Sequence, residues 1–283
     1  MNRSKVSPAT AVELQAAIYH FELAGQVVCI HASLRSFGHV VGGAPTVVQT
    51  FLDAGCTLLV PTFSYAFAIA PPTTLQVTRN GWNYGQHYGP LAEKGEIYTP
   101  TTKEIDADMG AIPATVLKLP SYARGTHPLN SFSAVGPQAT ALIADQAPLD
   151  VYAPLRVLVE AKGFVLLMGV TLDSMTLLHH AEQVAGRVAF RRWANDPHGA
   201  PQVVEAGSCS DSFEQLAPVV QPWLRKTMVG KASGNYFLQH QHYMPQRRQF
   251  VKIPTSPTMA ATIANGVAMS CWAGRFYRSK NMK

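Results

Sequence analysis

The chain has 283 residues, of which 47% are hydrophobic and 14% charged, so a sizeable core can form and an intrinsically disordered protein is excluded. No apolar run approaches the roughly 18 residues needed to span a bilayer, which argues against a membrane protein. The formal net charge of +6 is unevenly distributed. Residues 1–214 hold 13 Lys and Arg against 17 Asp and Glu, a charge of −4, whereas residues 215–283 hold 10 Lys and Arg and no acid.

The first elements in chain order predict a βαβ unit. Residues 9–23 have helical spacing and end before Gly25, a typical C-terminal cap. The short apolar run 26–30 is typical of a strand covered on both faces. A helical pattern over 44–55 and a second apolar strand over 57–63 follow. Strand, helix and strand in this order indicate a parallel sheet with helical cover.

Residues 64–108 are dense in Tyr, Pro, Gly, Thr and Asn, and we interpret them as a long functional loop excursion over the sheet. Downstream, we expect helices over 109–119, 136–146, 153–163 and 173–186, and a third strand over 164–170. The predicted fold is a single α/β domain, with a largely parallel central sheet sandwiched by helices and long loop insertions.

The C-terminal segment 231–283 is basic and shows no clear helical or strand period, so we assign it as a segment of uncertain order following a domain over residues 1–230. Its Lys and Arg are not interleaved with aromatic residues in a recognisable module, so nucleic acid is not an expected partner. HQH at 240–242 lacks a third ligand at metal-binding spacing.

Cysteine usage and the N-terminus favour a reducing, cytoplasmic location. The cysteines Cys29, Cys56, Cys209 and Cys271 include no CxxC pair, and Cys29 and Cys56 lie in apolar, strand-like runs typical of buried free thiols. The N-terminal residues lack the apolar stretch of a secretory signal.

TLLHHAE at 176–182 is the strongest catalytic candidate. On a helix His179 and Glu182 share a face, whereas His180 points about 100° away from His179. A carboxylate beside an imidazole raises its basicity and fixes its orientation, which suits a general base. The separation of the two rings weakens a shared metal site, although a metal-dependent hydrolase and a plain surface His–Glu pair remain alternatives.

A second candidate is HASLRSFGHVVGGAPT at 31–46, which directly follows a predicted strand. It offers hydroxyls, one Arg, and glycines that lead into a helix N-terminus, a natural anion site. The stretch contains neither GK[ST] nor GxGxxG, so a glycine-rich connection is an equal alternative. RGTHPLNSFSAVG at 124–136, taken alone, indicates a structural turn. The chain has no GxSxG elbow, which disfavours a serine hydrolase.

In three stretches taken in this order, the chain resembles the aminoglycoside 3-N-acetyltransferase family of antibiotic-resistance enzymes over residues 26–230. The stretches are HASLRSFG…GGA with TLLVPTFSY, MGAIPATVLKLPSYARGTHPLNSFSAVG, and VLLMGVTLDSMTLLHHAE. The resemblance implies transfer of an acetyl group from acetyl-coenzyme A to an amine of a 2-deoxystreptamine ring, in an acetyltransferase domain over 1–230. The family's T-x-x-H-x-x-E segment falls on Thr176, His179 and Glu182, with its aspartate on Asp173. Met175 stands where the family often has Asn.

The resemblance also implies a set of coenzyme contacts. They are His31, Ser33, Leu34, Arg35, Ser36, Gly43 and Ala44, followed by Thr62, Ser64, His127, Ser131 and Phe132. Acids in or near the excursion are candidate acceptor contacts: Glu93, Glu96, Glu104, Asp106 and Asp108.

The chemistry implied by the resemblance suits these residues, because an ammonium group must lose a proton before it can attack a thioester, and His179 oriented by Glu182 can take it. The expected co-substrate is acetyl-CoA, with no metal, and the expected partner is a small cationic amine, with no nucleic acid and no membrane. We expect a monomer or homodimer. Acetylation of another amine, such as a biosynthetic intermediate, and a nucleic-acid-binding protein built around the tail are the remaining alternatives.

Overall fold

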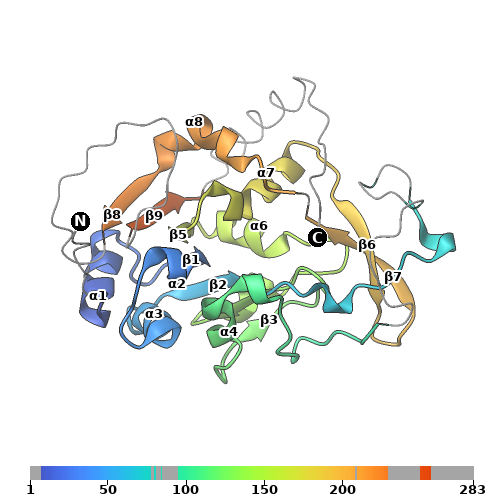
Figure 1. The fold of residues 1–283 in the computed structure, drawn as a ribbon, viewed down its shortest axis with the longest axis horizontal. Helices are drawn as coiled ribbons and strands as arrows, with labels where there is room; N and C mark the ends of the chain where they lie inside the picture. The colour runs from blue at the N-terminus through green and yellow to red at the C-terminus, as the bar shows by residue number, and fades with distance from the viewer. Residues whose placement is uncertain are drawn as a thin grey trace, which may run out of the picture.

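The computed structural model of the chain describes residues 8–77, 80, 84, 95–207, 209–228 and 249–255. A seven-stranded sheet with the strand order β3-β4-β2-β1-β5-β9-β8 forms its centre (Figure 1). The strands are β1 (Val27–Ala32), β2 (Thr57–Pro61), β3 (Ala123–Arg124), β4 (Phe132–Val135), β5 (Phe164–Met168), β8 (Arg225–Met228) and β9 (Gln249–Pro254). The three predicted strands correspond to β1, β2 and β5.

The sheet is parallel at its centre and antiparallel at its margins. β1 pairs in parallel with β2 on one side and with β5 on the other. β4 runs antiparallel to β2, and β9 antiparallel to β5. The predicted largely parallel sheet is therefore confirmed at its centre. The connection between β1 and β2 contains α3 (Gly43–Asp53), the crossover helix that neighbouring parallel strands require. Antiparallel neighbours need no such crossover.

Helices cover both faces of the sheet, and alternation along the strands divides the core in two. Val28 and Ile30 pack on one face with α1 (Ala11–His20), α3 and α4 (Ala111–Val116). Val27 and Cys29 pack on the other face with α5 (Ala139–Ile143), α6 (Ala153–Glu160), α7 (Leu177–Val184) and α8 (Ala217–Val220). Because successive strand side chains point to opposite faces, a continuous apolar strand needs cover on both, and the predicted sandwich is confirmed.

The loop excursion packs against a small second sheet. β6 (Phe190–Asn195) and β7 (Pro201–Ala206) form an antiparallel pair that the sequence analysis did not predict. Three 3-10 turns lie in the described part of the excursion: Tyr65–Phe67, Thr73–Leu75 and Ala107–Met109. The Trp193 indole donates a hydrogen bond to Leu75 O at 3.1 Å, and the Ile69 amide donates to Trp193 O at 2.9 Å. The excursion is thus attached to the hairpin through the Trp193 side chain and through backbone groups.

The basic C-terminal segment contributes a strand to the main sheet. β9 lies between β5 and β8, and just after it the Thr255 hydroxyl donates to Gly163 O at 2.8 Å. We propose that the domain extends through β9, beyond the boundary at residue 230. HQH at 240–242, Cys271 and Glu93 lie outside the described residues. Among the helices that the structure describes, none is long and apolar enough to cross a membrane.

Candidate active site

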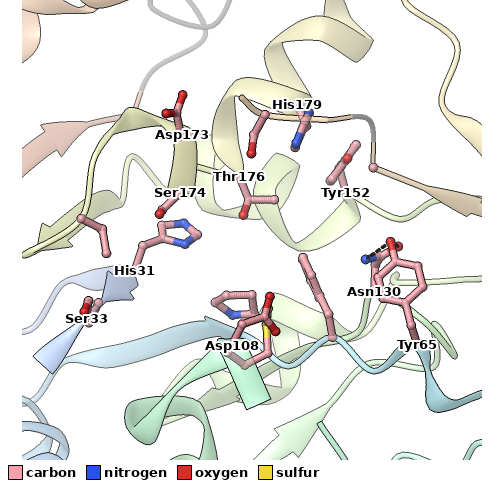
Figure 2. Close-up of a pocket in the computed structure, with 17 residues that line it drawn as sticks. His31, Ser33, Tyr65, Asp108, Asn130, Tyr152, Asp173, Ser174, Thr176 and His179 are labelled. Carbon is pink, nitrogen blue, oxygen red and sulfur yellow. Dashed lines mark hydrogen bonds between the residues drawn. The ribbon is translucent and has the colours of Figure 1, made fainter. Parts of the chain in front are cut away.

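The carboxyl ends of the central strands open into one cavity of about 400 Å³, called here the main cavity (Figure 2). Parallel strands present these ends at the same edge of a sheet, where open α/β folds place their ligand sites. The residues after β1, β2 and β5 all contribute. The lining consists of His31, Ala32, Ser33, Pro61, Phe63, Tyr65, Asp108, Met109, Asn130, Tyr152, Val170, Asp173, Ser174, Thr176, His179, Gly207 and Ser210.

His179 reaches the main cavity from the buried first half of α7. Its Nδ1 lies 2.9 Å from Glu182 Oε2, and Arg187 pairs with the other carboxylate oxygen of Glu182. A carboxylate at Nδ1 favours the tautomer with the proton on Nδ1, so Nε2 is the basic ring nitrogen. The Phe213 ring, 4.6 Å away between centroids, packs against the imidazole and restricts its rotation. The arrangement can therefore act as an oriented base.

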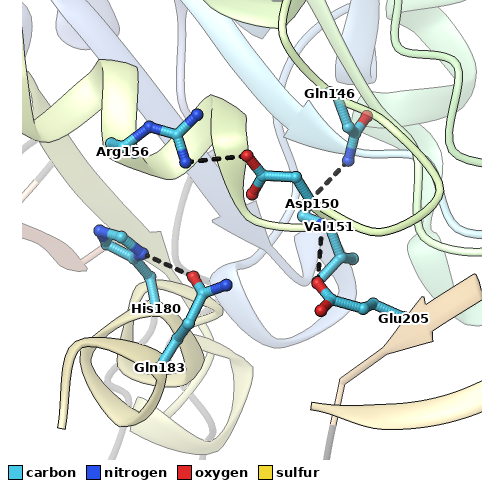
Figure 3. A network of polar contacts seen from close by, with 7 residues as sticks. All are labelled: Gln146, Asp150, Val151, Arg156, His180, Gln183 and Glu205. Carbon is cyan, nitrogen blue, oxygen red and sulfur yellow. Dashed lines mark hydrogen bonds and ion pairs between the residues drawn. The ribbon is translucent and has the colours of Figure 1, made fainter. Parts of the chain in front are cut away.

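His180 has different surroundings, although it is the neighbour of His179 in the sequence. Its Nδ1 lies 3.3 Å from Gln183 Oε1, beside the Asp150–Arg156 ion pair (Figure 3). Burial lowers the pKa of His180 below its ordinary value, because the charged ring would lose its hydration. Within the described ranges, no group of three or more His, Cys, Asp or Glu is arranged to hold a metal ion.

Asp173 and Thr176 line the main cavity on the segment between β5 and α7. Thr176 occupies the N-cap position of α7, and Asp173 Oδ1 accepts a hydrogen bond from the Glu214 amide at 3.1 Å. Met175 is fully buried in the apolar core, so the position where the family often carries Asn presents no side chain to the cavity.

The predicted coenzyme segment is divided between two cavities. His31 and Ser33 line the main cavity, whereas Leu34, Arg35 and Gly43 line a second cavity of about 430 Å³ together with Gly38, His39, Val40 and Gly42. Ser33 caps α2 (Leu34–Phe37) by accepting a hydrogen bond from the Ser36 amide at 3.3 Å. Ala44 is buried at the start of α3. The guanidinium of Arg35 and the hydroxyls of Ser33 and Ser36 suit an anionic, hydrogen-bonding ligand.

The other five predicted contacts, Thr62, Ser64, His127, Ser131 and Phe132, are buried and line neither cavity. His127 lies in a structural turn. Its Nε2 is 2.8 Å from Glu205 O, and its Nδ1 accepts a hydrogen bond from the backbone amide of Asn130 at 2.8 Å. Ser131 Oγ donates to Thr62 O at 2.9 Å. These residues support the wall of the main cavity from behind, where Asn130 faces it.

Several lining residues were missed by sequence reasoning, notably Tyr65, Asn130, Tyr152 and Ser174. The side-chain amide nitrogen of Asn130, Nδ2, lies 3.3 Å from the Tyr65 hydroxyl oxygen. Tyr65 carries a weak signal, since it follows a predicted strand end; the others carry none. Of the described acids that the sequence offers as acceptor contacts, only Asp108 lines the main cavity, and Glu96, Glu104 and Asp106 do not.

We expect the free energy of unfolding to fall as the pH drops from about 6.5 towards 4. Burial lowers the pKa of His31 and of His127 to about 4, whereas both rings titrate near 6.5 when unfolded. Between these values the unfolded chain binds more protons, so stability is full above pH 6.5 and is lost on acidification. The slope from both rings is at most about 2.7 kcal/mol per pH unit.

Urea unfolding at pH 7.5 and 5.0 measures this dependence, with His127→Gln expected to reduce the loss on acidification. His39→Gln is the control, because His39 is exposed. An equal loss in the wild type and in His127→Gln would contradict the assignment.

The aminoglycoside 3-N-acetyltransferase family matches residues 29–249. Aminoglycoside N(3)-acetyltransferase IX of Micromonospora chalcea is 35% identical over 167 residues, which cover 57% of this chain and 57% of the relative. The match thus spans little more than half of that relative's length.

Solved structures share the fold. AAC-VIa bound to sisomicin superposes with a TM-score of 0.68 at 20% identity, covering 93% of this chain and 99% of the other. AAC-IIIb in a binary complex with CoASH gives 0.65 at 22% identity, covering 93% and 98%. The fold and site define an α/β protein with a His–Glu pair at the carboxyl edge of its central strands. The chain belongs to the aminoglycoside 3-N-acetyltransferase family.

Proposed function

We propose that the protein transfers an acetyl group from acetyl-CoA to an amine of a 2-deoxystreptamine aminoglycoside, at the 3-N position that gives the family its name. The observation that carries this proposal is the 2.9 Å contact between His179 Nδ1 and Glu182 at the wall of the main cavity. Support comes from the family match and from relatives named as N(3)-acetyltransferases.

In this proposal His179 Nε2 takes the proton from the amine as the amine nitrogen forms a bond to the acetyl carbon, and Glu182 holds the ring and stabilises the imidazolium that forms. The C–S bond to CoA then breaks, and the imidazolium gives its proton to the departing thiolate. Arg187 on the far oxygen of Glu182 keeps the carboxylate in place. Such a base contributes about 10²–10⁴ in rate. The Thr176 hydroxyl faces the cavity and is available as a donor to the thioester oxygen as negative charge develops there.

Acetyl-CoA supplies the activated acetyl group, and the neighbouring AAC-IIIb was solved with CoASH. The residues present fit such a ligand, because the two cavities meet along one short segment. Ser33 lines the main cavity, and the next residue, Leu34, lines the second cavity. A long ligand held along this segment can place one end at His179 while Arg35 meets its anionic part.

The carboxylates of Asp108 and Asp173 at the main cavity suit a cationic acceptor. Acetylation removes one positive charge from that acceptor, which would weaken its attraction to RNA phosphates.

The test is CoA release from acetyl-CoA with gentamicin, kanamycin and a non-aminoglycoside diamine, followed by NMR assignment of the acetylated nitrogen. We expect turnover with the aminoglycosides and product acetylated at the 3-amine. Turnover with the diamine but with neither aminoglycoside would show that the acceptor is an amine of another class. CoA binding without turnover of any aminoglycoside would contradict the proposal.

A further inference from the structure

Tyr152 combines burial with a hydroxyl that lacks a protein partner. The residue precedes α6, is only 4% exposed, and lines the main cavity. Its hydroxyl has no hydrogen-bond partner among the residues that the structure describes. Two other buried side chains there share this feature, Ser64 and Arg191, but neither lines the cavity, and Arg191 forms an ion pair with Glu205. Tyr152 is therefore the one whose missing partner can be a ligand.

The tyrosine ring is held in a fixed position beside the base. It stacks on the His179 imidazole with centroids 5.9 Å apart and an interplanar angle of 13°. The preceding residue, Val151, is held through its carbonyl, which accepts from Gln146 at 2.8 Å. A Cβ built on Gly207 would lie 2.8 Å from the phenol oxygen, so the backbone at this position closes one side of the hydroxyl. The hydroxyl cannot turn to another protein group without loss of the stack.

The chemistry of the phenol is that of a neutral donor and acceptor. Burial, with Tyr65, Glu182 and Glu205 nearby, raises the pKa of Tyr152 well above its ordinary value, so the proton is retained. A phenol of this kind donates one hydrogen bond and accepts from hydroxyl or amine hydrogens. An unmatched buried hydroxyl disfavours folding, and functional sites are where such groups are retained.

The position of Tyr152 indicates which substrate it meets. Figure 2 shows Tyr152 beside His179 and on the same side of the cavity as Asn130 and Tyr65, across from His31 and Ser33. His31 and Ser33 belong to the segment assigned to acetyl-CoA, so the Tyr152 side is left for the acceptor.

We propose that the Tyr152 hydroxyl binds a hydroxyl or amine substituent of the acceptor, adjacent to the amine that His179 deprotonates. This assignment rests on the proposed function. The stacked ring and its hydroxyl then position the acceptor against the base, and the residue contributes to acceptor affinity rather than to proton transfer.

The test uses Tyr152→Phe in the full chain, with gentamicin and kanamycin as acceptors. We expect KM for the acceptor to rise about 3- to 10-fold, as for loss of one hydrogen bond, with kcat and the KM for acetyl-CoA little changed. The unfolding temperature without ligand should stay equal or increase, because no protein hydrogen bond is lost.

Tyr98→Phe is the matched control, since Tyr98 is also buried but its hydroxyl donates to Gly125 O at 2.7 Å, away from both cavities. We expect this variant to lower the unfolding temperature by about 2–4 °C and to leave acceptor KM unchanged.

Unchanged acceptor KM in Tyr152→Phe, with an active wild type, would overturn the assignment and leave the proposed function intact. A loss of stability like that of Tyr98→Phe would also overturn it, because the hydroxyl would then be structural. A wild type that acetylates neither aminoglycoside would overturn the proposed function and this assignment with it.

Discussion

His179→Ala is expected to lower kcat by about 10²–10⁴ while the affinity for CoA stays close to that of the wild type. The imidazole lies at the wall of the main cavity with Nδ1 held 2.9 Å from Glu182, so its loss removes the oriented base. The predicted coenzyme segment lies on β1, α2 and the start of α3, apart from α7, which is why CoA affinity should be retained. Steady-state kinetics with gentamicin and calorimetric titration with CoA measure the two effects.

His180→Ala is the matched control, because it removes the adjacent imidazole from the same helix. His180 bonds to Gln183 and lines neither cavity, so we expect kcat to change little. Glu182→Gln should give an intermediate loss, since an amide oxygen can still accept from Nδ1 but carries no charge to stabilise the imidazolium. Equal losses of kcat in His179→Ala and His180→Ala would contradict the assignment of His179 as the base.

Gly169→Ala is expected to destabilise the protein by about 3 kcal/mol, or roughly 5–10 °C in the unfolding temperature. Gly169 follows β5 with φ +69°, a conformation that costs an L side chain about 1–2 kcal/mol. A Cβ here would also overlap Phe37 N, lie 2.8 Å from Phe37 Cα, and lie 2.9 Å from Ser33 O. These are backbone atoms of α2 and its cap, so they cannot rotate away.

Gly25→Ala separates the two causes, because Gly25 has φ +73° and open space around its Cβ position. We expect a loss of only about 1 kcal/mol in that variant. Thermal unfolding of the two variants provides the comparison, and Gly169→Ala should in addition raise the KM for acetyl-CoA because Ser33 is displaced. An equal loss of stability in both variants would show that backbone conformation alone is responsible.

Local patterns were sufficient for the central elements of the fold. β1, β2 and β5 are short apolar runs between polar turns, and burial on both faces requires such runs. The β6–β7 hairpin was not recognised although its strands are neighbours in the sequence, because β6 carries Arg191 and Arg192 in place of a continuous apolar run. β9 was not recognised, because its partner in the sheet is distant in the sequence. β9 bonds to β5 across more than 80 residues, and no property of its own sequence specifies that register.

The same distinction holds for the site. His179 and Glu182 are three residues apart on one helix, so spacing alone predicts their contact. Tyr152, Asn130 and Tyr65 come to the cavity from three separate segments, and only the packed fold brings them together. The sequence also does not show which acid meets the acceptor. Asp108 faces the main cavity, whereas Asp106, two residues earlier, accepts a hydrogen bond from the Tyr65 backbone amide at 3.1 Å.

The placement of β9 has a consequence for biosynthesis. Every residue that lines the main cavity precedes residue 211, yet the free edge of β5 is covered only when residues 249–254 pair with it. A nascent chain therefore completes its cavity walls while one apolar central strand still presents unpaired backbone groups. Such an edge is a template for association with other chains. Demand for chaperones should thus be greatest late in synthesis, after the residues of the cavity have emerged from the ribosome.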